Sequence, residues 1–435
     1  MTASRTSNRI LVSAASLSPV RGSEPGIGWN ICSRLAGYFD LTVLSRPRIG
    51  EENLRREVDE HLAKHGPIPG LTIVYIEPPA ISRWLQRPHV SLAAPFYYVG
   101  YAAWQRAAFR VAMALHRERP FDLAHHLTIT GFREPGYLWK MGIPFIWGPV
   151  AGASDVPWRY FRILGVRDRV FYGLKNIVNA VHKRTKRRSR KAAETASYIF
   201  ANGQDNAELI GQWGRTSHIM LDTGAPPLSG EPRYYDGREP LRLVWSGLHA
   251  GRKALPLLLH ALVTVRSMLA AQPFTLTILG GGTETRAWQR LADRMGLEAF
   301  ITWTGQLSHE DAVAEMAKAH VFVLTSIQEG TPTVVMEALA CGLPVICHDA
   351  CGMAIAVTDA CGIKIPMRDP RESIQKFAEA ILALSRNPDR LHQLSLGAHR
   401  RAVELSWDRK VEEIAAIYSA VLGDAVAREF SMASR

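Results

Sequence analysis

The stretch that decides the fold is VFVLTSIQEGTPTVVMEALACGLPVIC, residues 321–347. Its apolar, β-branched start predicts a buried strand over Val321–Thr325, followed by a turn over Ser326–Thr331. Thr331 is a good N-cap and Pro332 suits the first helical position, so a helix is expected to begin here and to end at the following Gly-Leu-Pro. A strand that leads through a short turn into a helix is the repeating unit of an α/β sheet.

Two carboxylates flank the start of this helix. Glu329 precedes it and Glu337 lies inside it. A helix N-terminus at the carboxyl end of a parallel strand attracts phosphate through its free N–H groups and its partial positive charge. Carboxylates on either side of such a site suit the hydroxyl groups of a sugar. The alternative is that Glu329 is a solvated turn residue and Glu337 a surface residue.

Three further turns follow predicted strands in the same half of the chain. The strands Leu241–Ser246, Phe274–Leu279 and Phe300–Trp303 lead into the turns 247–253, 280–282 and 304–307. Arg252 and Lys253 suit a diphosphate, although they could equally be a solvated basic helix start. The three glycines from Gly280 allow a backbone to approach a ligand closely. The ends of parallel strands meet at one edge of a sheet, so these turns are expected to lie together.

The same alternation extends over the first half of the chain. Strands are predicted at 9–14, 40–45, 71–76, 121–125, 143–147, 198–202 and 218–222, and near 344–347 in the second half. We therefore expect an α/β protein with two Rossmann-like, doubly wound domains that face a central cleft. The first spans 1–225 and takes in the C-terminal helix 407–435. A linker, 226–240, rich in Pro, Gly and charge, separates it from the second domain, 241–406.

The pattern Glu-x7-Glu followed by Ala-x-Gly-x-Pro-Val-Ile resembles the donor half of retaining GT-B glycosyltransferases, glycosyltransferase family 4 (glycosyl transferases group 1) in particular. The resemblance covers about residues 241–370 well and the first domain loosely. It implies the GT-B fold and a sugar transfer with retention. It also implies that Glu329 holds hydroxyl groups of the donor sugar, as a catalytic residue, and that Glu337 holds the ribose of the nucleotide.

The resemblance extends to the remaining turns. Thr331 and Thr333 would lie by the diphosphate and Gln306-Leu307 near the base. The further donor-binding residues are Gly247, Arg252, Lys253, Gly281 and Gly330. One departure is that Leu248 stands where the family usually has an Arg, which Arg252 could replace.

In the first domain, the turn after the first strand is similar to the family's first glycine-rich loop, with Gly22 and Gly26 as substrate-binding residues. The alternative is a helix-start turn with glycines for geometry. A pair of histidines, His125 and His126, ends the strand at 121–125. The family has a histidine in its cleft at this position, and we expect His126 to be this catalytic residue.

The net charge of +12 is local. Twelve of the 52 Lys and Arg residues lie between Pro157 and Lys191 with a single acid, Asp168, so this segment alone carries +11. Val170, Leu174 and Val181 recur with apolar neighbours at the spacing of one helical face. A basic amphipathic helix with aromatic residues favours an anionic membrane surface. The alternative is a helix that packs on the sheet by this apolar stripe.

The sequence therefore predicts a retaining hexosyltransferase of class EC 2.4. Its donor is a UDP- or GDP-linked sugar, and its acceptor a glycan on polyprenyl diphosphate in bacterial cell-surface polysaccharide synthesis. No cofactor, metal or nucleic acid is expected. The five cysteines form no metal or disulfide pattern, and we expect a cytoplasmic protein on the inner face of the membrane, bound through 157–191. The alternatives are a GT-B-fold nucleotide-sugar epimerase and a non-catalytic basic binding module.

Overall fold

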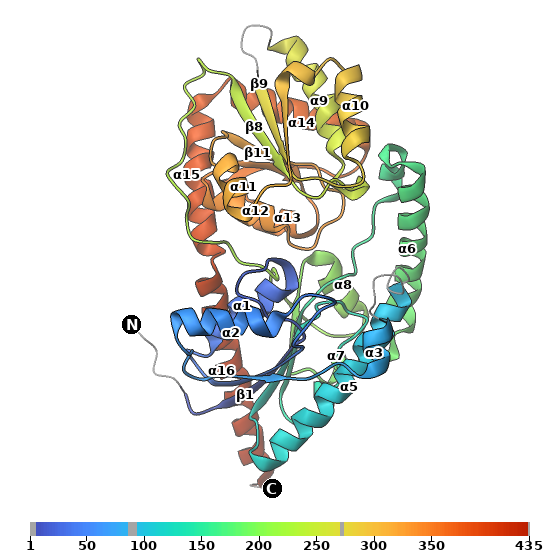
Figure 1. The fold of residues 1–435 in the computed structure, drawn as a ribbon, viewed down its shortest axis with the longest axis vertical. Coiled ribbons are helices and arrows are strands. Elements are labelled where there is room, and N and C mark those ends of the chain that lie inside the picture. The colour runs from blue at the N-terminus through green and yellow to red at the C-terminus, as the bar shows by residue number, and fades with distance from the viewer. Residues whose placement is uncertain (1–5, 86–93, 270–273, 434–435) are drawn as a thin grey trace. The chain divides into compact units, whose positions relative to one another are not determined.

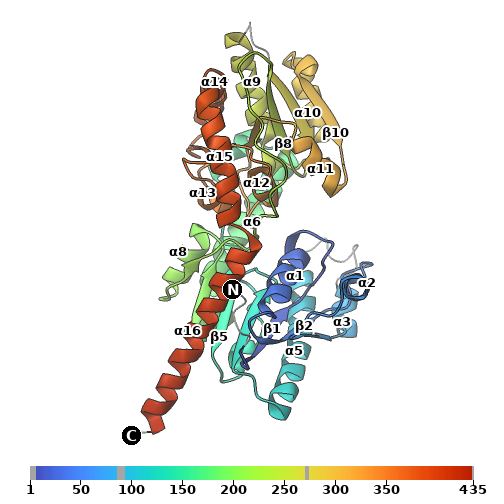
Figure 2. The same ribbon diagram turned by 90° about the vertical axis from the view of Figure 1, so that its left-hand side faces the viewer.

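The computed structural model describes residues 6–85, 94–269 and 274–433. The chain forms two compact units, each with its own parallel sheet (Figures 1 and 2). Unit 1 consists of Met1–Ala153, His182–Thr223 and Trp407–Arg435. Unit 2 consists of Ser154–Val181 and Gly224–Ser406.

Unit 1 contains a seven-stranded sheet in the order β3-β2-β1-β4-β5-β6-β7. The strands are β1 (Arg9–Ala14), β2 (Asp40–Ser45), β3 (Leu71–Tyr75), β4 (Leu123–Thr128), β5 (Phe145–Val150), β6 (Tyr198–Ala201) and β7 (His218–Ile219). The helices are α1 (Ser23–Leu35), α2 (Leu54–His65), α3 (Ala80–Leu85), α5 (Ala94–Glu118), α7 (Arg187–Thr195), α8 (Gln204–Gln212) and α16 (Trp407–Ala433). From β1 the chain first adds β2 and β3 on one side and then β4 to β7 on the other. This reversal of direction at β1 is a doubly wound topology.

Side chains of β1 alternate between two apolar layers. Ile10 and Val12 pack in a cluster that includes Tyr418 of α16, whereas Leu11 packs in a cluster that includes Trp104 of α5. Helices thus cover both faces of the sheet, which is why its strands are apolar throughout rather than alternating. The C-terminal helix α16 lies against α1. An ion pair between Arg34 of α1 and Asp408 of α16 joins the two helices.

Unit 2 contains a six-stranded sheet in the order β10-β9-β8-β11-β12-β13. The strands are β8 (Leu241–Ser246), β9 (Phe274–Leu279), β10 (Ile301–Gly305), β11 (Val321–Leu324), β12 (Val345–His348) and β13 (Gly362–Ile365). The helices are α6 (Val166–Thr185, of which 166–181 belong to this unit), α9 (Leu255–Met268), α10 (Thr285–Arg294), α11 (His309–Met316), α12 (Thr333–Ala340), α13 (Cys351–Ala356), α14 (Pro370–Ser385) and α15 (Pro388–Glu404).

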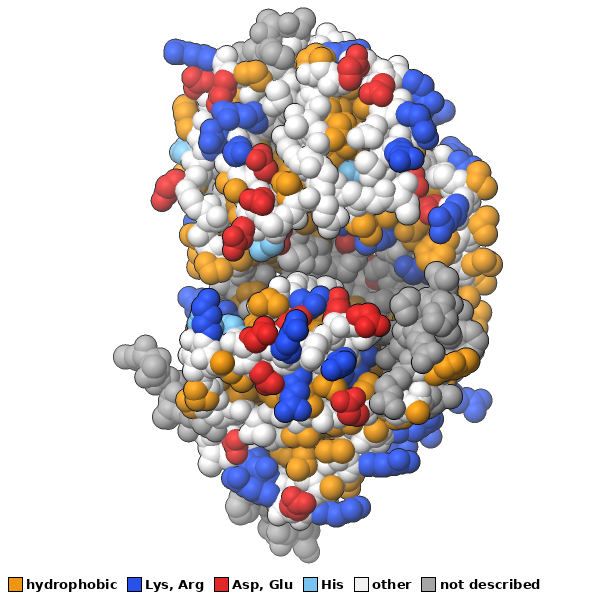
Figure 3. All heavy atoms as spheres, in the orientation of Figure 1, with side chains coloured by type: hydrophobic (Ala, Val, Ile, Leu, Met, Phe, Trp, Pro, Cys, Tyr) orange, Lys and Arg blue, Asp and Glu red, His pale blue; other side chains and the backbone are white. Residues whose placement is uncertain are grey.

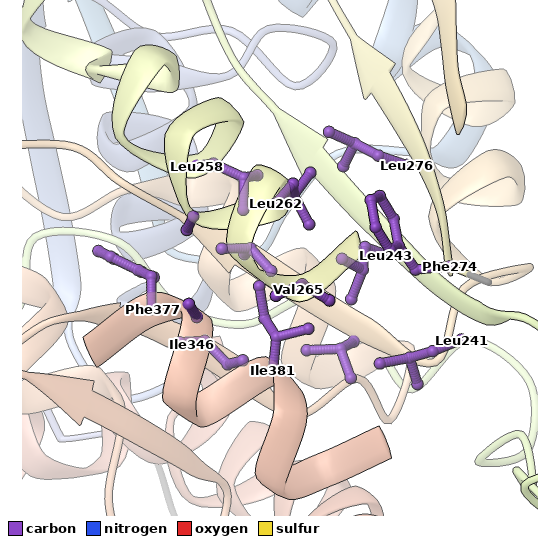
Figure 4. Close-up of a cluster of buried hydrophobic side chains, with 14 of the residues drawn as sticks. Leu241, Leu243, Leu258, Leu262, Val265, Phe274, Leu276, Ile346, Phe377 and Ile381 are labelled. Atoms are coloured by element: carbon purple, nitrogen blue, oxygen red, sulfur yellow. The ribbon is translucent and has the colours of Figure 1, made fainter. Parts of the chain in front are cut away.

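The core of unit 2 lies between the sheet and helices α9 and α14 (Figure 4). Leu258, Leu262 and Val265 extend from α9 toward Leu243 of β8, and Ile381 approaches from α14. Each of these side chains is fully buried. Burial of one such aliphatic side chain contributes about 1.5–3 kcal/mol, so this layer fixes the strand ends from which the turns emerge.

Several boundaries differ from those predicted. Helix α12 begins at Thr333, not at Pro332, because Pro332 has an extended backbone (φ −72°, ψ 109°) and acts as the N-cap. Strand β13 was not expected: its four residues, Gly-Ile-Lys-Ile, are short, and the lysine interrupts the apolar pattern.

Residues 154–181 belong to unit 2, although the sequence placed them in the first domain. The reason is a separate apolar cluster in which Tyr160, Leu164 and Tyr172 pack against Leu257 and Ile327. This attachment joins segments that lie 85 to 167 positions apart in the chain, which periodicity does not reveal.

Candidate functional site

A cavity of about 210 Å³ lies at the carboxyl edge of the sheet of unit 2. Four predicted substrate-binding residues line it together, namely Gly247, Gly281, Gln306 and Leu307. The other lining residues are Ser246, Leu248, Leu279, Gly280 and Ala312. The turns after β8, β9 and β10 therefore meet as the sequence predicts.

The glycines are required where two of these turns touch. A Cβ added at Gly280, which has φ +109°, would lie 2.3 Å from the carbonyl oxygen of Gly247. A Cβ at Gly282 would lie 2.5 Å from the carbonyl oxygen of His249. Both distances are too short for any side chain, so only glycine permits the two turns to form one rim of the cavity.

A buried cluster of charges lies beside this rim. The Oε1 atom of Glu329 is 2.6 Å from the Nζ atom of Lys253 and 3.0 Å from an Nη1 atom of Arg252. The side chains of Glu329 and Lys253 are each 8% exposed. A Cβ added at Gly247 would lie 3.5 Å from Lys253 Nζ, so the ammonium group also reaches the cavity rim. The three charged residues predicted from separate turns are thus brought together.

The charges decide the ionisation of Glu329. Burial by itself would raise the pKa of this carboxyl, but the positive charges of Lys253 and Arg252 outweigh it and hold the pKa below its usual value. Arg252 also donates to the carbonyl oxygen of Gln328 at 3.1 Å, and the backbone N–H of Ile327 donates to the carbonyl oxygen of Arg252 at 2.9 Å. The Glu329 turn and the Arg252 turn are therefore one hydrogen-bonded unit.

Glu337 lies on α12 and has a partner that the sequence analysis missed. The Nδ1 atom of His309, the first residue of α11, is 3.6 Å from a carboxylate oxygen of Glu337. Burial raises the pKa of Glu337, and this effect outweighs the charge of His309, which by itself would lower the pKa. A signal for His309 did exist: Ser308 caps α11 directly after β10, at the edge of the sheet where the other turns lie.

Gly330, Thr331 and Thr333 continue from Glu329 to the start of α12. The carbonyl oxygen of Gly330 accepts a hydrogen bond from the N–H of Gly352 at 3.0 Å, which fixes the turn. Thr333 is the first helical residue, and no side chain caps this N-terminus. Free N–H groups at a helix start favour an anion.

In unit 1, Gly22 is the N-cap of α1 and Gly26 lies in its first turns. A Cβ at Gly26 would be 2.3 Å from the carbonyl oxygen of Arg21, whereas nothing lies within 4 Å of a Cβ at Gly22. The geometry thus requires glycine at Gly26 but not at Gly22. Glu24, between them, accepts a hydrogen bond from the backbone N–H of Thr130 at 3.0 Å.

The two histidines of β4 have different surroundings. His125 is hydrogen-bonded through both nitrogens, to the hydroxyl of Tyr418 at 2.5 Å and to the carbonyl oxygen of Gly148 at 2.7 Å. His126 is equally buried, and its nitrogens make no hydrogen bond of standard geometry, although the backbone of Ile129 interacts with the ring. Burial lowers the pKa of His126 to about 3, so its ring is neutral at pH 7. Both nitrogens of His125 are thus engaged in hydrogen bonds, whereas His126 is held less firmly.

Helix α6 exposes its apolar stripe. Leu174 is 60% exposed, and Val170, Ile177, Val178 and Val181 are exposed in the same way. The structure therefore contradicts packing on the sheet by this stripe. Figure 3 shows hydrophobic side chains on the surface where Figure 1 places α6.

The inward side of α6 carries polar residues instead. Asn176 is buried and exchanges two hydrogen bonds with the backbone of Val156, at 2.7 and 3.2 Å. Asn179 is buried as well and donates to a carboxylate oxygen of Asp155 at 2.6 Å. A surface helix ordinarily places its apolar stripe against the core, and α6 does the reverse.

The described residues contain neither a group of metal-binding side chains nor a helix that could span a membrane. Over 6–85, 94–269 and 274–433, no three His, Cys, Asp or Glu side chains are grouped so that they could hold a metal ion. Within the same residues, no helix has the length and apolar character that crossing a membrane requires.

Comparison with known proteins relates part of the chain to glycosyltransferases. Residues 240–387 match the family model described as "Glycosyl transferases group 1". A D-inositol 3-phosphate glycosyltransferase of Streptomyces bingchenggensis is 29% identical over 247 residues, which is 52% of this chain and 53% of the relative. A GDP-mannose-dependent alpha-(1-6)-phosphatidylinositol monomannoside mannosyltransferase of Mycolicibacterium smegmatis is 33% identical over 26% of this chain and 31% of its own length. The chain thus spans about half, or less, of these curated relatives.

Solved structures match over nearly the whole chain. Sucrose-phosphate synthase from Thermosynechococcus elongatus has a TM-score of 0.63 and 15% identity, with 96% of this chain and 100% of that chain covered. The lipopolysaccharide outer core galactosyltransferase WaaB has a TM-score of 0.60 and 14% identity, over 95% of this chain and 99% of that chain. Anabaena HepE, solved with UDP, has a TM-score of 0.57 and 15% identity over 95% and 100%. The predicted GT-B fold is confirmed, and within it residues 240–387 are similar to the glycosyl transferases group 1 family.

Proposed function

We propose that this protein is a retaining glycosyltransferase that moves a sugar from a nucleoside diphosphate to a lipid-linked glycan in cell-surface polysaccharide synthesis. The observation that carries the proposal is the cluster of Glu329, Lys253 and Arg252 at the rim of the cavity. It combines a carboxylate for sugar hydroxyls with two cations for a diphosphate, beside an uncapped helix start.

The donor would lie along this edge in three parts. The cavity at Gly281 and Gln306 suits the base, and Glu337 suits the ribose hydroxyls. The diphosphate would lie between Lys253 and Thr333. Solved structures with this fold include complexes with UDP, UDP and glucose, and UDP-glucose, which supports a nucleotide-linked sugar as the donor.

In the transfer itself, the bond between the sugar C1 and the diphosphate oxygen breaks, and a bond from C1 to the acceptor hydroxyl oxygen forms on the same face. The acceptor proton passes to the leaving diphosphate. The protein contributes position and electrostatic stabilisation: Lys253 and Arg252 neutralise the charge that grows on the diphosphate, and Glu329 orients the sugar. No resident cofactor enters this scheme.

We place His126 on the acceptor side of the reaction. The support is its contrast with His125, whose two nitrogens are both engaged, because a histidine without a hydrogen bond of standard geometry retains hydrogen-bonding capacity for a ligand. Gly22 at the N-cap of α1 and Gly26 in its first turns would shape the substrate-binding start of this helix. With a pKa of about 3, His126 would act as a neutral hydrogen-bonding group.

The acceptor and the location are proposed from the segment 157–191, with its +11 charge and the exposed apolar face of α6. These features suit an anionic membrane surface, where each nearby cation contributes about 1 kcal/mol. We therefore place the protein on the inner face of the cytoplasmic membrane. The mannosyltransferase of M. smegmatis, by its name, acts on a phosphatidylinositol monomannoside, which supports a lipid-linked acceptor.

The test is thermal stabilisation by UDP, GDP and ADP, followed by transfer from the matching sugar nucleotides and nuclear magnetic resonance of the product. A ligand at 100 times its Kd adds about 2.7 kcal/mol to the unfolding free energy. An anomeric configuration unlike that of the donor would overturn retention. Conversion of the donor to an epimer without transfer would favour an epimerase, and salt-sensitive binding to RNA but not to anionic vesicles would favour a basic binding module.

A further inference from the structure

The buried side of α6 packs on the two turns that carry the charge cluster. Tyr172, which is 6% exposed, shares an apolar cluster with Ala254 and Ile327. Ala254 directly follows Lys253, and Ile327 lies two residues before Glu329. Tyr172 therefore belongs to one apolar cluster with residues of both turns.

Two further contacts join the helix to the same turns. The Nζ atom of Lys175 donates to Oε1 of Gln328, next to Glu329, at 3.0 Å. A Cβ added at Gly251 would lie 2.0 Å from a carboxylate oxygen of Asp168, so Asp168 fills the space beside Arg252 that a larger residue would need. Contacts at three successive turns of one helix thus support the Arg252 and Glu329 turns.

We propose that α6 couples binding of an anionic membrane surface on its exposed side to donor binding on its buried side. The coupling rests on the proposed function, because it assigns regulation to the same donor site. Its basis is that the exposed apolar residues, such as Leu174 and Val178, alternate along one helix with Tyr172 and Lys175, which contact the site.

The expected effect of the membrane on donor affinity follows from the conformational entropy that the donor turns lose on binding. A helix held by a membrane at Leu174 and Val178 fluctuates less, and so do the turns that rest on Tyr172. A donor that binds to turns already ordered loses less conformational entropy on binding. The membrane surface should therefore tighten donor binding, and by reciprocity the donor should tighten membrane binding.

The occupant of the exposed face is argued from charge. Arg167 and Arg169 are exposed at the start of α6 and Arg184 at its end, so the apolar residues lie between cations. Two copies of the chain that met through this face would bring like charges together, whereas anionic lipids supply the opposite charge. An anionic bilayer is consequently the partner that fits.

The experiment measures the Kd of UDP and GDP by calorimetry in buffer, with phosphatidylcholine vesicles, and with vesicles that also contain phosphatidylglycerol. Co-sedimentation reports vesicle binding separately. Anionic vesicles should lower the Kd about fivefold or more, the lower end of typical coupling, and neutral vesicles should not. The double variant Leu174→Glu and Val178→Glu should lose both vesicle binding and this ratio.

Matched controls separate the two sides of the helix. Met268→Glu and Val403→Glu introduce the same charges at exposed apolar positions on other helices of unit 2, and the vesicle effect should survive them. Lys175→Met and Tyr172→Ala should still bind vesicles but show a smaller Kd ratio. Wild-type protein that co-sediments with anionic vesicles and has an unchanged Kd would overturn the coupling alone. If neither UDP nor GDP binds under any condition, the proposed function fails and the coupling with it.

Discussion

Lys253 and Glu329 form a buried ion pair of 2.6 Å, to which Arg252 adds a second cation. The carboxylate that is proposed to hold the donor sugar thus engages the cations that are proposed to hold the diphosphate. A bound diphosphate and Glu329 would compete for the same positive charge. Removal of the Glu329 charge should therefore not weaken diphosphate binding, whereas removal of the Lys253 charge should.

Glu329→Gln should lower the transfer rate without weakening nucleoside diphosphate binding. The amide removes the negative charge that engages Lys253, so the diphosphate meets less competition. The lost hydrogen bonds to the sugar should cost roughly ten- to a hundredfold in kcat, as expected for bonds to a charged group. Calorimetry with UDP and GDP and steady-state kinetics would check both effects. A loss of diphosphate affinity as large as the loss of rate would contradict the assignment of Glu329 to the sugar.

Lys253→Met should weaken a nucleoside diphosphate by about 1.5–3 kcal/mol while leaving the parent nucleoside nearly unaffected, since only the diphosphate carries the charges. Arg252→Met should act in the same direction. Lys376→Met, at an exposed site on α14, is the matched control. It should change neither the affinity for the nucleoside diphosphate nor that for the nucleoside. Equal losses for nucleoside and diphosphate would mean that these side chains have a structural role.

Nucleoside affinity should fall on acidification because of Glu337. Burial raises the pKa of this carboxyl, so it takes up a proton at a higher pH than an ordinary glutamate and then accepts hydrogen bonds from ribose less well. Titrations with uridine and guanosine from neutral pH downward should show the decline. Glu337→Gln should weaken binding at neutral pH and flatten the pH dependence. A decline that persists in this variant would point to another group.

Lys410 of α16 should make stability rise with pH in the alkaline range. Burial lowers its pKa to about 8 from 10.5, although its amine donates to the carbonyl oxygen of Leu221. Between these values the unfolded chain binds a proton that the folded chain has released. The unfolding free energy therefore rises by about 1.4 kcal/mol per pH unit. Thermal unfolding of wild type and Lys410→Met from pH 8 to 10.5 should show a difference that grows with pH; a constant difference would refute it.

The sequence alone was enough for most of the strands, though not for β13, and for the donor turns. Strands β1, β2, β8 and β9 have the predicted bounds because continuous β-branched runs between glycine and proline turns have few other stable conformations. Gly247 and Gln306 meet because parallel strands end at a common edge, a rule that holds without knowledge of side-chain packing.

Only the tertiary structure decided what each charge contacts. Sequence spacing put Lys253 and Glu329 on neighbouring turns but contained nothing about their pairing. This pairing depends on side chains that meet across 75 intervening positions and on the burial that strengthens their attraction. Hydrophobic periodicity likewise could not predict which face of α6 is buried. An apolar stripe identifies a helical face, but whether that face meets a core or solvent depends on the contacts of Tyr172 and Asn176 with distant segments.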